Sequence, residues 1–351
     1  MKALIFEGKE AISYTTVADP SIINPTDAIV RVQLCAVCGS DLHVYHQRET
    51  GLDNGTVMGH EFAGDIVAIG SHVRLLKIGD QVVSPFTTNC GTCYYCKIGL
   101  TCRCTQGQLY GWVEKGKGLH GGQAQYVRVP LADTTLVKYD PSIPIEIALL
   151  TGDIRATGYH CATQANIQPT GVYVVVGCGP VGLMCIIAAF ELGAQQVYAI
   201  DTLPERINLA KHYGATPINA TQTDAVAILK DATNGRGADG VLEAVGSPQA
   251  MQLAYNLLRP GGTLSSVGVH TTTQFSFSPI DAYDKNITLR MGRAPARHYM
   301  QQLLNNSTQT LFDPSLIITH RFALAQGAAA YQLLDTKQQG CIKAVLSPFD
   351  N

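Results

Sequence analysis

The densest group of reactive side chains in the sequence is a run of cysteines between residues 90 and 104. Cys90, Cys93 and Cys96 follow one another with two-residue gaps, and Cys104 completes a set of four thiols, with Cys102 as a fifth candidate. Zinc binds four thiolates in a tetrahedral site, and short gaps let neighbouring cysteines reach one ion. Because four cysteines leave no open position, the pattern predicts a structural zinc ion that takes no part in a reaction.

A second group combines a thiol, an imidazole and carboxylates. Cys38 and His60 offer a sulfur and a nitrogen ligand, and Glu61 or Asp153 can add an oxygen ligand. A catalytic zinc ion has three protein ligands and keeps its fourth position for water or substrate. Asp153 has an alternative interpretation as the N-cap of a helix that begins IRATGY, because aspartate is a favoured N-cap residue.

A third motif is the segment YVVVGCGPVG, which contains Gly177, Gly179 and Gly182 between a strand pattern and an apolar helix pattern. Such glycines allow a tight turn, close approach of a pyrophosphate and contact between helix and strand. Asp201 ends the next predicted strand, where a carboxylate binds the adenosine ribose hydroxyls and disfavours a 2′-phosphate. The motif therefore predicts NAD binding; a plain glycine turn with a solvated aspartate is the weaker interpretation.

These groups fall in two regions with different patterns. The first ~150 residues contain short β-type runs separated by Gly, Pro and Asp, which are typical of a compact antiparallel sheet or barrel-like unit. From about residue 150 a helical stretch, IPIEIALLTGDIRATGYHCATQANI, leads into alternating strands and helices, the rhythm of a parallel sheet. The last residues predict two helices and a strand, too few for a core of their own, so we expect them to pack on the first region.

Composition narrows the class of protein. A chain of 351 residues suits two domains, and its formal net charge of −2 without a basic run argues against a nucleic-acid partner. No apolar run reaches the ~18 residues that span a bilayer, and the N-terminus does not resemble a signal peptide. We therefore expect no membrane partner and a cytoplasmic location, where the 11 cysteines would stay reduced and the clustered ones would bind metal.

Taken together, the motifs CGSDLH, GHE, the cysteine run, GDIRATGY, GCGPVG with Asp201 and the closing IKAVL resemble the zinc-containing medium-chain dehydrogenase/reductase family over essentially the whole chain. The resemblance implies an α/β fold: a Rossmann doubly wound parallel sheet at 155–290, plus a discontinuous, mainly β, GroES-like catalytic domain. That domain would comprise 1–154 and 291–351, with a structural zinc lobe at about 86–106.

The resemblance also implies residue roles. The catalytic zinc ligands would be Cys38, His60 and Asp153, with Glu61 as an acidic neighbour able to enter the shell, and the structural zinc ligands would be Cys90, Cys93, Cys96 and Cys104. Ser40 and His43 would relay the substrate proton to solvent, and Phe86 and Trp112, with Ser40, would line the substrate pocket. Coenzyme contacts would come from Thr157, Gly177, Gly179, Pro180, Val181, Gly182, Asp201, Arg206, Val267, Val269 and Lys343. Arg206 and Lys343 keep a plain alternative as solvated surface charges.

We expect from this family an NAD-dependent enzyme with two zinc ions per subunit. It would reversibly oxidise primary or secondary alcohols to aldehydes or ketones, with an alkoxide held on the catalytic zinc and hydride passed to nicotinamide. Polyol, threonine or formaldehyde dehydrogenase activity is the alternative within the family, and a non-catalytic NAD- and zinc-binding protein is the alternative outside it. By analogy with microbial relatives of this length, the chain is expected to form a homotetramer.

Overall fold

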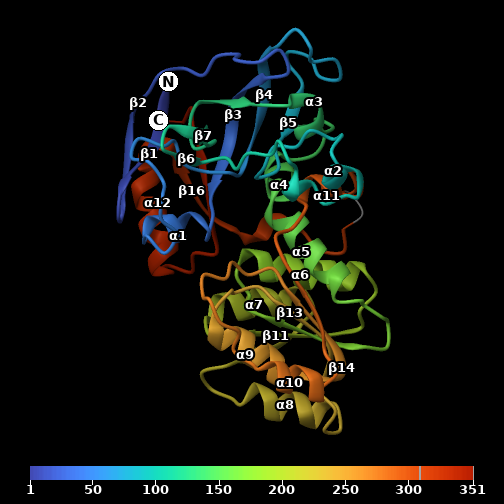
Figure 1. The fold of residues 1–351 in the computed structure, drawn as a ribbon. Coiled ribbons are helices and arrows are strands. Elements are labelled where there is room, and N and C mark those ends of the chain that lie inside the picture. The colour runs from blue at the N-terminus through green and yellow to red at the C-terminus, as the bar shows by residue number, and fades with distance from the viewer. Residues whose placement is uncertain (308–309, 351) are drawn as a thin grey trace. The chain divides into compact units, whose positions relative to one another are not determined.

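The computed structural model describes residues 1–307 and 310–350, which form two compact units (Figure 1). The first unit contains 1–156, 295–307 and 318–350, and the second contains 157–294 and 310–317. The change between units thus falls at 156 and 295 rather than at 154 and 291, and one short late segment, 310–317, belongs to the second unit.

Most of the first unit is built from short strands. Its strands are β1 (Lys2–Gly8), β2 (Ala11–Thr16), β3 (Ala28–Val37), β4 (Phe62–Ile69), β5 (Gln81–Val83), β6 (Trp112–Glu114), β7 (Lys117–Leu119), β8 (Tyr126–Val129), β9 (Val137–Lys138), β16 (Ile318–Ala323) and β17 (Lys343–Ser347). The main sheet has the order β16-β17-β3-β4-β5-β9, with β8 also paired to β3. Because β17 pairs antiparallel with β3, the end of the chain completes the sheet that its beginning started.

The helices of this unit are mostly short and lie in connections. They are α1 (Asp41–Tyr45), α2 (Tyr94–Lys97), the 3-10 turn η1 (Thr101–Arg103), α3 (Ala132–Thr135), α4 (Ile145–Gly152), α11 (Ala296–Asn305), η3 (Leu324–Gln326) and α12 (Gly327–Thr336). Helix α12 lies against β2 and β17 (Figure 1).

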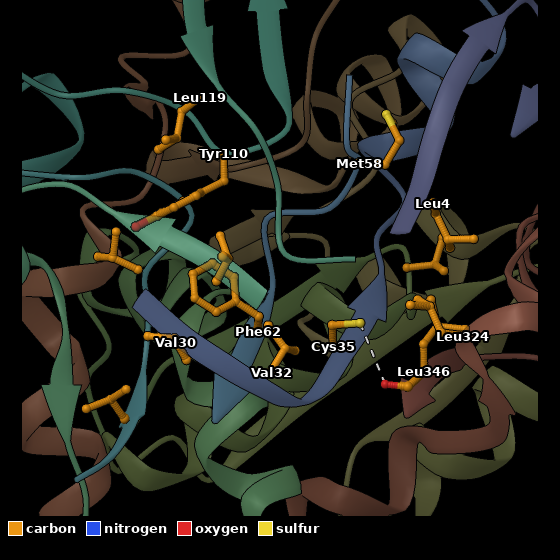
Figure 2. Close-up of a cluster of buried hydrophobic side chains, with 14 of the residues drawn as sticks. Leu4, Val30, Val32, Cys35, Met58, Phe62, Tyr110, Leu119, Leu324 and Leu346 are labelled. Atoms are coloured by element: carbon orange, nitrogen blue, oxygen red, sulfur yellow. Dashed lines mark hydrogen bonds between the residues drawn. The ribbon is translucent and has the colours of Figure 1, made fainter. Parts of the chain in front are cut away.

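An extended apolar cluster fills much of the first unit. Figure 2 shows Tyr110 edge-on to Phe62, and their ring centroids are 5.0 Å apart. In the same view the thiol of Cys35 donates to the carbonyl oxygen of Leu346 at 3.6 Å, across the β3–β17 pair. Burial of these side chains supplies the main stabilisation of the scaffold, at roughly 25 cal/mol for each Å² of apolar surface removed from water.

The second unit is a parallel sheet with helical crossovers. Its elements are α5 (Ile154–Gln164, which begins in the first unit), β10 (Val172–Val176), α6 (Pro180–Glu191), β11 (Gln196–Asp201), α7 (Pro204–His212), β12 (Thr216–Asn219), α8 (Ala225–Ala232), β13 (Ala238–Glu243), α9 (Pro248–Leu257), β14 (Leu258–Ser266), α10 (Pro279–Asp284), β15 (Thr288–Met291) and the 3-10 turn η2 (Pro314–Ile317). The strand order is β12-β11-β10-β13-β14-β15, and every pair is parallel. This is the doubly wound order whose direction reverses beside the first strand, where such sheets bind ligands.

The predicted fold class, a Rossmann sheet with a mainly β partner domain, is confirmed. One local prediction needs refinement: the helical stretch that starts at residue 145 is two helices, because Asp153 leaves helical geometry with φ −139° and ψ −79°. Among the described residues, no helix has both the length and the apolar character needed to span a bilayer.

Candidate metal centres and nucleotide site

Two strand ends of the first unit and a break between two helices meet where the catalytic metal centre was predicted. Cys38 follows β3 directly, and His60 and Glu61 directly precede β4, which pairs with β3 through Cys35 and Phe62. Asp153 comes from the break between α4 and α5. The structure brings one ligand atom from each of Cys38, His60, Glu61 and Asp153 within 4.8 Å of one another.

The imidazole of His60 is held between two carboxylates. Its Nδ1 lies 3.2 Å from Oδ1 of Asp41, and its Nε2 lies 3.3 Å from Oδ2 of Asp153. Histidine ligands commonly donate one ring N–H to a carboxylate, which leaves the other nitrogen for the metal. The contact with Asp41 therefore leaves Nε2 as the nitrogen that could bind a metal. Sequence analysis missed Asp41, although its place within CGSDLH was a usable signal.

The charges in this group suit a divalent cation. Asp41, Glu61 and Asp153 are all buried, with Cys38 beside them, and the buried cation of the group is Lys343. Unpaired buried anions are costly, so a cation is needed for balance. Burial lowers the pKa of His60, but the carboxylates of Asp41 and Asp153 outweigh it and hold that pKa well above its usual value. The same field attracts a metal cation to Nε2.

Lys343 is buried and paired with Glu61. Its Nζ donates a 2.6 Å hydrogen bond to Oε1 of Glu61, and its side chain is 1% exposed. The register of the strands brings Lys343 to this place. Ala344 of β17 is the partner of Val37 of β3, so Lys343 lies beside Cys38, which follows β3. The alternative of a solvated surface charge disagrees with this buried position, and a contact of Lys343 with the coenzyme pyrophosphate stays a prediction.

The proposed proton relay begins at the same place. The hydroxyl of Ser40 lies 3.3 Å from Nε2 of His60, at the start of α1. His43 lies one turn further along α1, and its Nδ1 is buried with no hydrogen-bond partner among the described residues. Burial lowers the pKa of His43, so its ring is neutral and able to accept a proton near pH 7.

The four predicted cysteines also converge. The sulfur atoms of Cys90, Cys93, Cys96 and Cys104 lie within 4.8 Å of one another. Backbone N–H groups point at these sulfurs: Cys93 N–H to Sγ of Cys90 at 3.4 Å, and Cys90 N–H to Sγ of Cys104 at 3.2 Å. Backbone N–H groups of Cys96 and Thr105 lower the pKa of Cys93 to about 6. Hydrogen bonds of this kind favour the thiolate form that binds zinc at Cys90 and Cys93, whereas burial raises the pKa of Cys96, to about 12, and that of Cys104. Cys102, the fifth candidate, lies in η1 outside this set and is half-buried.

The nucleotide motif lies at the switch point of the second sheet. Its turn joins β10 to α6, whose N-cap is Gly179 and whose first residue is Pro180, so helical N–H groups face the turn. Any side chain at Gly182 would collide with the carbonyl oxygen of Gly177. The carboxylate of Asp201 accepts hydrogen bonds from the N–H groups of Cys178 at 2.7 Å and Leu203 at 3.0 Å.

A buried carboxylate that sequence analysis missed organises the neighbouring loops. Glu243 ends β13, and its Oε1 accepts the N–H groups of Val245 at 2.8 Å and Gly246 at 2.7 Å. Its Oε2 accepts the hydroxyl proton of Ser266 at 2.7 Å, which ends β14. Glu243 therefore fixes the carboxyl ends of both strands. Glu243 is the acidic residue near the end of the strand pattern in DGVLEAVG, but an acidic side chain at the end of a strand is usually solvent-exposed.

Comparison with known proteins agrees with this geometry. A family model described as an alcohol dehydrogenase GroES-like domain matches residues 24–140, and one described as a zinc-binding dehydrogenase matches residues 180–309. The chain is 38% identical over 344 residues to zinc-type alcohol dehydrogenase B of Aspergillus flavus, covering 95% of this chain and 79% of the relative. It is 30% identical to a sorbitol dehydrogenase of Bacillus subtilis, covering 99% and 97% of the two chains.

Among solved structures, alcohol dehydrogenase TADH from Thermus sp. ATN1 matches with a TM-score of 0.93 and 39% identity, over 99% of both chains. The chain belongs to the zinc-containing medium-chain alcohol dehydrogenase family. It is therefore an oxidoreductase of the zinc-dependent alcohol and polyol dehydrogenases, and family membership implies zinc and a nicotinamide coenzyme.

The remaining predicted positions of this dehydrogenase lie in both units. Phe86 is buried, and Trp112 packs on the apolar core of the first unit, so its contacts are those of a core residue. Thr157 is buried in α5. Val267 directly follows β14 and donates its N–H to the carbonyl of Glu243 at 3.0 Å, while Val269 is 40% exposed. In the same unit, Arg206 lies 3.9 Å from the carboxylate of Asp201.

Proposed function

We propose that this dehydrogenase reversibly oxidises primary or secondary alcohols with NAD, using zinc ligated by Cys38, His60 and Asp153. The observation that carries the proposal is the buried convergence of a thiol, an imidazole and two carboxylates around one point. Three protein ligands with a further carboxylate tied to Lys343 fit an ion that keeps an open position. When bound, zinc supplies Lewis acidity toward an alcohol oxygen, and NAD supplies the hydride acceptor.

The chain's own residues then orient groups and move a proton. Asp41 orients His60, and Lys343 restrains Glu61 through a 2.6 Å hydrogen bond. Ser40 is placed to accept the substrate hydroxyl proton, and neutral His43, one helical turn away, is placed to pass it on. We assign the Cys90, Cys93, Cys96 and Cys104 group to a second, structural zinc ion.

One feature supports NAD rather than NADP as the coenzyme, and a second supports an oligomeric enzyme. The carboxylate of Asp201 ends β11 beside the glycine turn, where its charge repels a 2′-phosphate. The edge strand β15 has all four residues exposed, including Leu289 and Met291, so it leaves a sheet edge open to a second copy. Pairing at this edge would join two copies, and we propose a homotetramer by analogy with microbial relatives of this length.

The deciding experiment measures NADH formation with ethanol, longer primary alcohols, secondary alcohols and sorbitol. Sorbitol enters because of the Bacillus subtilis relative, whose similarity spans nearly the whole chain. The proposal expects turnover of simple alcohols with NAD and much weaker turnover with NADP. Turnover of sorbitol alone would replace the proposed substrate class by polyols, and no turnover of any alcohol would reject the proposed activity.

A further inference from the structure

A buried hydrogen-bond chain leads from helix α12 to the predicted metal ligand His60. The hydroxyl of Tyr331 donates to Oε1 of Gln123 at 2.9 Å. Nε2 of Gln123 donates to Oδ2 of Asp41 at 3.2 Å, and Oδ1 of Asp41 lies 3.2 Å from Nδ1 of His60. Tyr331 and Gln123 have no solvent exposure, so this chain is shielded from competing water.

The direction of the chain is fixed by a backbone carbonyl. Nε2 of Gln123 also donates to the carbonyl oxygen of Ala36 at 3.0 Å, and a carbonyl can only accept. The amide nitrogen must therefore face Ala36 and Asp41, which leaves the amide oxygen for Tyr331. The hydroxyl of Tyr331 and the amide of Gln123 then both donate in the direction of Asp41. The Asp41 oxygen that accepts the Gln123 N–H, Oδ2, also accepts the backbone N–H of Cys38 at 2.9 Å.

The surrounding backbone is shaped to accept this chain. Gly59 precedes His60 with φ +90°, and a side chain there would collide with the side chain of Gln123. Tyr331 also packs its ring against Tyr45, 5.7 Å away between centroids, at the end of the helix that starts at Asp41. Burial holds the pKa of Tyr331 well above its usual value, so its hydroxyl stays a donor.

We propose that Gln123 and Tyr331 are positioning residues that fix the Asp41 carboxylate and, through it, the tautomer and direction of His60. This inference rests on the proposed function, since it assumes that His60 binds the catalytic metal. The two residues contact no ligand atom themselves. Their effect is on how firmly His60 presents Nε2, and outer hydrogen-bond partners of this kind typically change metal affinity by about 10- to 100-fold.

The test loads the full-length protein with cadmium in place of zinc and records the NMR resonances of the bound cadmium. The Cys90–Cys104 site and the Cys38–His60–Asp153 site differ in their number of thiolate ligands, so they give separate resonances and the first is an internal reference. For Tyr331→Phe we expect the mixed-ligand resonance alone to shift or broaden. Cadmium loss from that site to a chelator should be about tenfold faster. Gln123→Met should move the same resonance further.

Tyr213→Phe is the matched control. Tyr213 is also fully buried, and its hydroxyl donates to the carbonyl oxygen of Asp313 at 3.0 Å within the second unit, whereas both cysteine sites belong to the first unit. The Tyr213→Phe variant should have a similarly lowered free energy of unfolding, while both cadmium resonances and the rate of cadmium loss stay as in wild type. The inference is overturned if Tyr331→Phe matches Tyr213→Phe in both readouts. A wild-type protein without a mixed-ligand resonance would instead overturn the proposed metal site, and the inference with it.

Discussion

The ammonium group of Lys343 and the carboxylate of Glu61 form a buried ion pair, with 2.6 Å between Nζ and Oε1. Burial alone would lower the pKa of Lys343, but attraction to Glu61 outweighs it and holds that pKa above its usual value. The other carboxylate oxygen, Oε2, is buried and has no hydrogen-bond partner among the described residues. The pair thus occupies one carboxylate oxygen of Glu61 and leaves the other without a hydrogen-bond partner among the described residues.

Removing one partner of this ion pair should lower the free energy of unfolding more than removing both partners. Lys343→Met leaves a buried carboxylate without its partner and should lower the free energy of unfolding by about 3–5 kcal/mol. The double variant Lys343→Met with Glu61→Gln should recover much of that loss, because no uncompensated charge remains. Urea denaturation of metal-free and zinc-loaded protein measures both. Equal losses in the single and double variants would show that the ion pair is not what holds this region.

The half-buried His43 should make stability and activity fall on acidification. Its pKa lies below the unfolded value of about 6.5, so the unfolded chain binds the proton more readily between those two values. The free energy of unfolding should therefore decrease as pH falls through about 6.5, and alcohol oxidation should weaken as the ring gains its proton. In His43→Gln the local acid sensitivity should shrink and turnover near pH 7 should drop. Unchanged pH profiles of both quantities would reject the relay role of His43.

Asp201 should decide between the two nicotinamide coenzymes. Asp201→Ser keeps a small polar side chain but removes the negative charge near the ribose. We expect kcat/KM with NAD to fall and kcat/KM with NADP to rise, each by about tenfold or about 1.4 kcal/mol of transition-state binding. Arg206, 3.9 Å from that carboxylate, would then be free to meet a 2′-phosphate. If the NAD-to-NADP preference stays as in wild type, another residue sets it.

The structural site can be tested with two neighbouring cysteines. Cys104→Ser removes one of four converging thiols, whereas Cys102→Ser removes a thiol outside the converging set. The first variant should lose one equivalent of zinc and several degrees of thermal stability, and the second should keep both zinc equivalents. Zinc analysis and thermal melting decide the matter. The assignment of Cys104 fails if the two variants exchange these results.

Motifs whose members lie close in sequence could be read without a structure. The cysteine run needed only local folding, since a turn and a short helix bring Cys90, Cys93 and Cys96 together. The parallel sheet also followed from local patterns, because buried strands such as Val172–Val176 alternate regularly with helices. The predicted helix from residue 145 missed its break at Asp153, whose backbone leaves the helical region with φ −139° and ψ −79°.

Contacts between distant segments could not be read in this way. Glu61 and Lys343 are 282 residues apart in sequence, and Gln123 and Tyr331 are 208 apart. Nothing local distinguishes the lysine of IKAVL from a surface lysine, since its burial depends on how β17 pairs with β3. Likewise, the amide of Gln123 gains its role from three segments that meet only in the folded unit.

The central claim is that Cys38, His60 and Asp153 hold the zinc ion that the reaction needs. The most direct measurement is zinc content together with NADH formation for wild type and Cys38→Ser. We predict two zinc equivalents per chain in wild type, one in Cys38→Ser, and loss of alcohol oxidation with that single equivalent. Two equivalents retained in Cys38→Ser, or full activity with one, would contradict the account.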